Sequence, residues 1–208
     1  MSRSDQSIRE DAAFLRALAQ GGAEGSAKDG AILLAVGLIF GVVSLQYWVL
    51  DSGLFRAPKA LLPWLWLDGV VPFLIVLALI TRKFRGQAPG AASRALSAAW
   101  SGVGAAHIVA AIALAVGGLR LGLPLLASWA FPVVLFSMYG AAWSVAFAAR
   151  RRRAFALNAA GSYLTALLCG AAMGRPEEWL VLAGGLFLLV AIPGAGILRA
   201  SRRPAGRT

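Results

Sequence analysis

The feature that most constrains this chain is a series of six long apolar runs. They cover residues 31–50, 61–81, 98–119, 124–149, 154–172 and 178–198. A helix needs about 20 residues to cross the hydrocarbon core of a bilayer, and each run is close to that length or longer. The runs therefore predict an all-α, polytopic membrane protein with six transmembrane helices.

Composition supports this fold class. Hydrophobic residues make up 59% of the 208 positions and charged residues 14%, whereas a soluble domain is roughly half apolar and a quarter charged. Six spans of about 20 residues use most of the length, and no separate catalytic domain fits. We expect three parts: an N-terminal segment over residues 1–29, a transmembrane bundle over 30–199 and a basic tail over 200–208.

Positive charge is distributed unevenly between the loops. Of the 20 Lys and Arg residues, 16 fall in segments on one side of the predicted membrane and four on the other. Cytoplasmic loops carry the excess of cations, so both termini are expected in the cytoplasm. The same clusters flank the spans, which explains the net charge of +11. We therefore expect the lipid bilayer as a partner and no nucleic acid.

The N-terminal segment differs from the rest of the chain. Residues 4–20 predict an amphipathic helix, because Ile8, Ala12, Leu15 and Leu18 gather on one side of it. This face is a candidate docking surface for a protein partner. The alternative is a helix that lies passively on the inner leaflet.

Two ionisable residues stand out inside the runs, where such groups are costly. Asp68 precedes Pro72 by four residues, and proline has no N–H to donate to the Asp68 carbonyl, so a free carbonyl and a carboxylate lie at one level. His107 lies roughly 7 Å from that level, at ~1.5 Å per residue. The two residues form a candidate intramembrane polar site for a cation or a proton. The alternatives are an interfacial cap for Asp68 and a packing residue for His107.

Other chemistry is sparse. The chain has one His and one Cys, Cys169, and it has no zinc-type spacing, phosphate-binding loop or nucleophile elbow. We therefore expect no enzymatic activity, no cofactor and no metal. The first function hypothesis is an accessory or regulatory subunit that acts through protein contacts. The alternative is a small transporter or channel with a polar path through Asp68 and His107.

Small residues and short connections predict how the spans pack. Gly37 with Gly41 and Gly170 with Gly174 are G-x-x-x-G pairs, which suit internal helix packing or, alternatively, an oligomer interface. Connections as short as residues 150–153 predict antiparallel hairpins between sequential spans.

A short repeat links the third and fourth runs. Ala-Ala-Trp-Ser occurs at residues 98–101 and again at 141–144. The two copies would lie at similar depth, which indicates either paired packing of tryptophan against small residues or chance in an Ala-rich chain.

Four stretches carry a family resemblance. They are residues 11–19, 90–95, 139–143 and 186–194, all rich in Ala, Gly or Leu. They resemble an uncharacterised family of small bacterial six-span membrane proteins. The resemblance implies a location in the bacterial inner membrane, and it implies neither an activity nor site residues.

Overall fold

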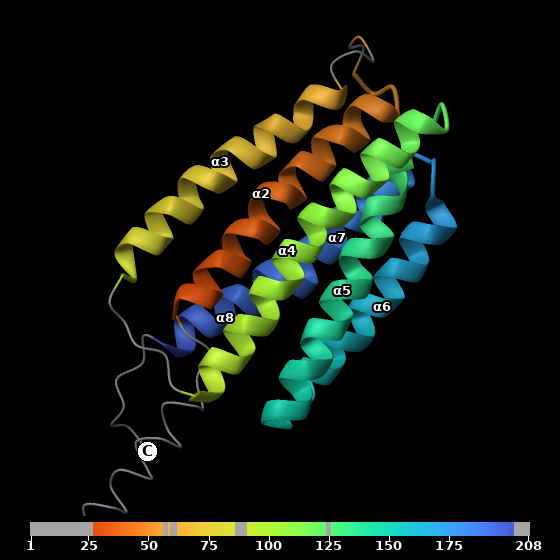
Figure 1. The fold of residues 1–208 in the computed structure, drawn as a ribbon. Coiled ribbons are helices and arrows are strands. Elements are labelled where there is room, and N and C mark those ends of the chain that lie inside the picture. Colours follow the sequence, from red (N-terminus) through yellow and green to blue (C-terminus); the bar gives the residue numbers. More distant parts are fainter. Residues whose placement is uncertain (1–26, 56–57, 59–61, 86–90, 124–125, 202–208) are drawn as a thin grey trace, which may run out of the picture.

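The computed structural model describes residues 27–55, 58, 62–85, 91–123 and 126–201, which form only helices and their connections (Figure 1). The elements are α2 (Ala27–Asp51), α3 (Leu62–Lys83), α4 (Ala91–Arg120), α5 (Leu126–Arg150), α6 (Arg153–Ala172), α7 (Glu177–Leu186), the π-helical turn η2 (Phe187–Ala191) and α8 (Ile192–Ala200). The last three run on as one span, so that six helices are long and apolar enough to cross a membrane. The six-span prediction is confirmed, and the protein is a multi-pass membrane protein.

Two predicted parts lie outside the described residues. One is the amphipathic helix over residues 4–20, with its face of Ile8, Ala12, Leu15 and Leu18. The other is most of the basic tail, because the description ends at residue 201.

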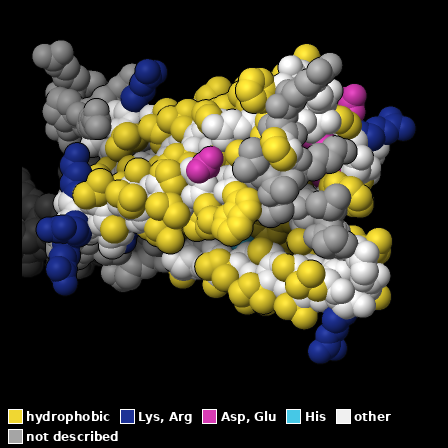
Figure 2. All heavy atoms as spheres, turned by 90° about the horizontal axis from the view of Figure 1, so that it is seen from above, with side chains coloured by type: hydrophobic (Ala, Val, Ile, Leu, Met, Phe, Trp, Pro, Cys, Tyr) yellow, Lys and Arg dark blue, Asp and Glu magenta, His cyan; other side chains and the backbone are white. Residues whose placement is uncertain are grey.

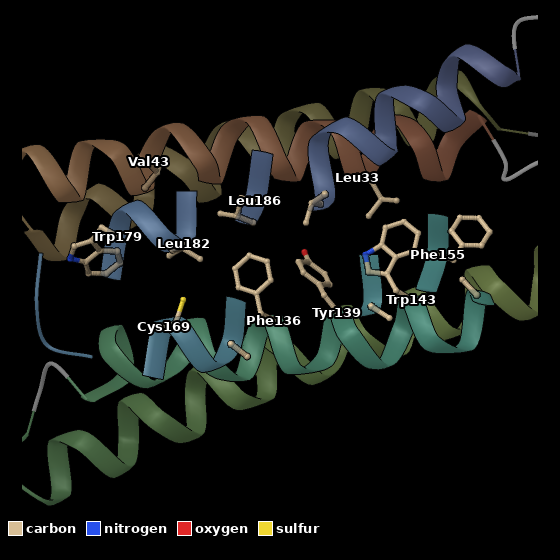
Figure 3. Close-up of a cluster of buried hydrophobic side chains, with 14 of the residues drawn as sticks. Leu33, Val43, Phe136, Tyr139, Trp143, Phe155, Cys169, Trp179, Leu182 and Leu186 are labelled. Atoms are coloured by element: carbon tan, nitrogen blue, oxygen red, sulfur yellow. The ribbon is translucent and has the colours of Figure 1, made fainter. Parts of the chain in front are cut away.

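The six spans form two layers (Figures 1 and 3). In one layer, α2 packs between α3 and the last span, and in the other α5 packs between α4 and α6. The layers meet at one edge, where α6 contacts α7.

At the opposite edge, the structure differs from the prediction that sequential spans pack as antiparallel hairpins. Helices α3 and α4 have no extensive contact, although they follow one another in the chain. Helix α3 belongs to one layer and α4 to the other, and Trp66 of α3 contacts Phe131 of α5, with ring centroids 6.3 Å apart. Sequential packing is therefore wrong for this pair of spans.

Large side chains fill the space between the layers. Phe136, Tyr139 and Trp143 project from α5 toward α2 and the last span (Figure 3). Their exposed fractions are 0%, 6% and 1%. Trp143 also packs edge-on against Trp100 of α4, with ring centroids 4.9 Å apart. The two tryptophans of the repeated Ala-Ala-Trp-Ser motif are thus in direct contact.

Glycines bring α2 close to the last span. A Cβ added at Gly37 would lie 2.5 Å from the Ala191 nitrogen, and one added at Gly41 would lie 2.6 Å from the Phe187 ring. Both glycines therefore serve packing within the chain, which is how small residues bring helices together in membranes.

The second glycine pair has a different environment. A Cβ at Gly170 would meet only Val133, at 3.9 Å. Gly174 has a φ of 77° in the connection between α6 and α7. Glycine adopts this left-handed conformation without the strain that a side chain causes, so Gly174 serves the turn.

The π-helical turn has a local cause. The Ile192 N–H donates a hydrogen bond to the Phe187 carbonyl, five residues earlier. Pro193 follows directly, and its ring would clash with a carbonyl of the preceding turn in a regular α-helix. The wider π turn accommodates the proline and places Ala191 against Gly37.

Charged side chains gather at the ends of the bundle. We call the end that holds Ala27 and Ala200 the terminal end, and the end that holds Asp51 and Glu177 the far end. Figure 2 shows Lys and Arg side chains at both ends and hydrophobic side chains over the middle of the visible face. This distribution suits a bundle whose middle lies in hydrocarbon.

Candidate functional site

Asp68 lies on the exposed side of α3, in an open groove between α2 and α3. We call this the α2/α3 groove. It has a volume of about 700 Å³ and is lined by Leu38, Ile39, Val42, Val43 and Gln46 from α2 and by Leu67, Asp68, Val71 and Pro72 from α3. At ~1.5 Å per residue, Asp68 is roughly 9 Å along α3 from Leu62. It lies within Trp64–Lys83, the stretch of α3 that is long and apolar enough to span a membrane.

The groove combines an apolar lining with a few polar groups. Gln46 and Asp68 are its polar side chains, and both are exposed. Pro72 has no N–H to donate to the Asp68 carbonyl. The Asp68 carboxylate makes no hydrogen bond or ion pair with the residues that the structure describes. The groove thus presents the Asp68 carboxylate, which only accepts when ionised, and the Gln46 amide, which both donates and accepts.

His107 lies between α4 and α5. Its Nε2 is 3.3 Å from the Leu135 carbonyl oxygen, and because a carbonyl only accepts, Nε2 is the donor. The imidazole ring also packs edge-on against Tyr139, at 5.2 Å, and against Phe131, at 6.0 Å. This environment is that of a hydrogen-bonded packing residue which ties α4 to α5.

The structure does not bring Asp68 and His107 together. Asp68 faces the α2/α3 groove, whereas His107 bonds to α5. Phe131 packs against both Trp66 and His107, so an aromatic contact occupies the space between α3 and α4 at this level. No continuous polar path joins the two residues in the described part of the chain.

A buried carboxylate at the far end was not predicted. Glu178, the second residue of α7, has an exposed fraction of 0%. Its Oε2 accepts a hydrogen bond from the Gly174 N–H at 2.9 Å, which holds the turn after α6. Its Oε1 is buried and has no hydrogen-bond partner among the described residues.

Aromatic rings surround this end of the bundle. Trp179 stacks on Tyr47 of α2, with ring centroids 4.4 Å apart. The indole Nε1 of Trp179 donates to Oδ2 of Asp51 at 3.3 Å. Asp51 and Glu178 are also close enough to interact electrostatically. These contacts join α2 to the last span at the far end.

The sequence held one signal for this cluster. Glu178 follows Gly174 by four residues, with a proline between them, and a glutamate at that distance can accept from a turn N–H. Glu177 precedes the sixth apolar run and Glu178 begins it, so both occupy the position of ordinary flanking charges in the sequence. Among the described residues, no group of three His, Cys, Asp or Glu side chains is placed to hold a metal.

Comparison with known proteins yields no relative. Family models, curated proteins and solved structures were all searched, and none matches the chain. The resemblance to a bacterial six-span family therefore has no support from these comparisons.

Proposed function

We propose that this protein is a non-enzymatic membrane protein that acts through protein contacts, as an accessory or regulatory subunit. One observation carries the proposal: Asp68 is exposed within an apolar groove of the spanning region and has no partner in the described part of the chain. The groove is the contact surface that we assign to this function.

The energetics favour an occupant with a positive charge. An ionised side chain at the centre of a bilayer costs about 3 kcal/mol by insertion scales, and less toward the interface. A cationic donor on a neighbouring helix offsets this cost, because it can form a charged hydrogen bond with the Asp68 carboxylate in the groove. We therefore assign the groove to one transmembrane helix of a partner protein, with a Lys or Arg side chain at the level of Asp68.

Packing supports the same surface. Helix α3 contacts α2 and has no extensive contact with another helix, so one side of it is open to a partner. A transport path through Asp68 and His107 has less support, because the two side chains face different surroundings.

The proposal includes an orientation. The excess of Lys and Arg at alternate loops supports cytoplasmic termini, and we include in the proposal the bacterial inner membrane that the sequence resemblance implies. In that orientation Asp68 lies in the outer half of the bilayer. The N-terminal face of Ile8, Ala12, Leu15 and Leu18 is then available to a second protein contact on the cytoplasmic side.

Site-specific photocrosslinking tests the groove. A photoreactive residue at Leu38 or Val71 lies in the groove, and one at Leu164 lies on the exposed side of α6, with an exposed fraction of 57%. In native membranes we expect the groove positions to crosslink to a transmembrane peptide that contains Lys or Arg. Asp68→Asn should abolish that product. Crosslinks to lipid alone, or equal products from Leu164, would refute the proposal.

A further inference from the structure

The connection between α5 and α6 concentrates positive charge at the terminal end. Helix α5 ends at Arg150 and α6 begins at Arg153, so the connection consists of Arg151 and Arg152 and an arginine flanks it on each side. We call residues 150–153 the arginine turn. Because both flanking helices are spans, the turn lies at the level of the lipid headgroups.

Arg150 lacks acceptors for part of its guanidinium. Its Nε and Nη2 atoms are buried and have no hydrogen-bond partner among the described residues. Asp29, in the first turn of α2, attracts Arg150 electrostatically, whereas Arg152 repels it. Four consecutive guanidinium groups give the turn a strong positive field.

The backbone at Arg151 is unusual. Its φ is 51°, and it is the one non-glycine residue with a positive φ in the described part of the chain. Its N–H donates to the Phe147 carbonyl at 2.7 Å and closes the end of α5. Glycine is the favoured residue at such a helix end, since a side chain is strained there. The turn thus holds an arginine where local energetics favour glycine.

The start of α6 adds to the field. Arg152 is the N-cap residue, and its side chain makes no capping hydrogen bond. The free N–H groups of a helix N-terminus carry partial positive charge and attract anions. The N-terminus of α6 and the arginine side chains therefore act on the same small region.

We propose that the arginine turn binds the phosphate of an anionic phospholipid headgroup. A guanidinium forms paired hydrogen bonds with phosphate oxygens, and several of them at headgroup level favour a lipid with net negative charge over a zwitterionic one. Neither the α2/α3 groove nor its occupant enters this inference.

The test uses the full-length protein in a neutral detergent. We expect phosphatidylglycerol to raise the midpoint of thermal unfolding, because a ligand of the folded state stabilises it. Phosphatidylcholine and inorganic phosphate at the same concentration should leave the midpoint unchanged. Equal stabilisation by phosphatidylcholine would overturn charge selection, and equal stabilisation by inorganic phosphate would overturn the lipid as the source of the phosphate.

Two variants separate the turn from general surface charge. Arg151→Gly keeps the backbone conformation, so it should raise the midpoint without lipid while it weakens phosphatidylglycerol binding by about tenfold, the loss expected for one charged hydrogen bond. Arg82→Gln, in the last turn of α3, removes a charge from the same end of the bundle and should retain wild-type binding. Equal losses in both variants would overturn the site, because they would show that only diffuse charge attracts the lipid.

Discussion

Gly37 of α2 packs directly against the backbone of Ala191 in the π-helical turn. A Cβ on Gly37 would lie 2.5 Å from the Ala191 nitrogen and 2.7 Å from the Leu186 carbonyl oxygen. Lipid tails are as apolar as Leu, so close backbone packing contributes more to helix association in a membrane than apolar burial does. The contact therefore stabilises the layer that contains α2.

Replacing this glycine tests the contact. Gly37→Ala should reduce the free energy of unfolding by about 1–3 kcal/mol, because backbone atoms must move to admit the new methyl group. Gly104→Ala in α4 is the matched control, since a Cβ there meets nothing within 4 Å. The control should be neutral or stabilising by up to about 1 kcal/mol. The free energy of unfolding in detergent is the measurement for both variants. Equal effects of the two changes would contradict close packing at Gly37.

The buried carboxylate at the far end gives a second prediction. Glu178→Ala removes the acceptor of the Gly174 N–H and should cost about 2 kcal/mol of stability, typical of a buried donor left unpaired. Glu178→Gln keeps an oxygen that accepts from the Gly174 N–H, so this variant should lose less than half as much stability as Glu178→Ala. The same unfolding measurement ranks the two variants. A glutamine variant as unstable as the alanine variant would show that the carboxylate charge itself is required.

The spans were predictable because hydropathy is a local property. The predicted run over residues 31–50 and the helix Ala27–Asp51 differ by only a few residues. Which helices pack together depends on how side chains that are distant in sequence fit against one another. The hydropathy pattern along the chain does not show this fit. The contact between Trp66 of α3 and Phe131 of α5 is of this kind.

The candidate site likewise contains residues that the sequence indicates and one residue that only the packed structure reveals. Asp68 and His107 were found because ionisable groups inside apolar runs are conspicuous in sequence. Glu178 was missed because its burial depends on helices that are distant in sequence, including the one that carries Tyr47. A charge at the start of a span is usually solvated, and only the packed structure shows that this one is not.

Membrane topology provides a third prediction. Reporter fusions after Arg85, Arg153 and Arg203 should be cytoplasmic, because the positive-inside rule places the cation-rich loops there. Fusions near Arg56, Arg120 and Arg175 should lie on the outer side. Alkaline phosphatase and fluorescent-protein reporters distinguish the two sides. One inverted loop would break the alternation that six spans require.

The N-terminal segment provides a fourth prediction. The apolar face predicted for residues 4–20 would be unfavourable in water and should bind a surface, so replacing Leu15 and Leu18 by Asp should release the segment. Release would appear as faster proteolysis at Gly21 and Gly22 in native membranes. The matched change of Arg9 and Arg16 to Gln leaves the apolar face intact and should retain slow cleavage. If the Asp variant is cleaved at the wild-type rate, the segment was not docked.

A double-mutant cycle tests whether Asp68 and His107 are coupled. Asp68→Asn should not lower the free energy of unfolding, because it removes a charge that is costly in hydrocarbon and has no partner among the described residues. His107→Leu removes the hydrogen bond to the Leu135 carbonyl and should cost about 1 kcal/mol. Because the two side chains share no partner, the double variant should equal the sum of the single changes within about 0.5 kcal/mol. A coupling energy above about 1 kcal/mol would contradict their separation and would revive a polar path between them.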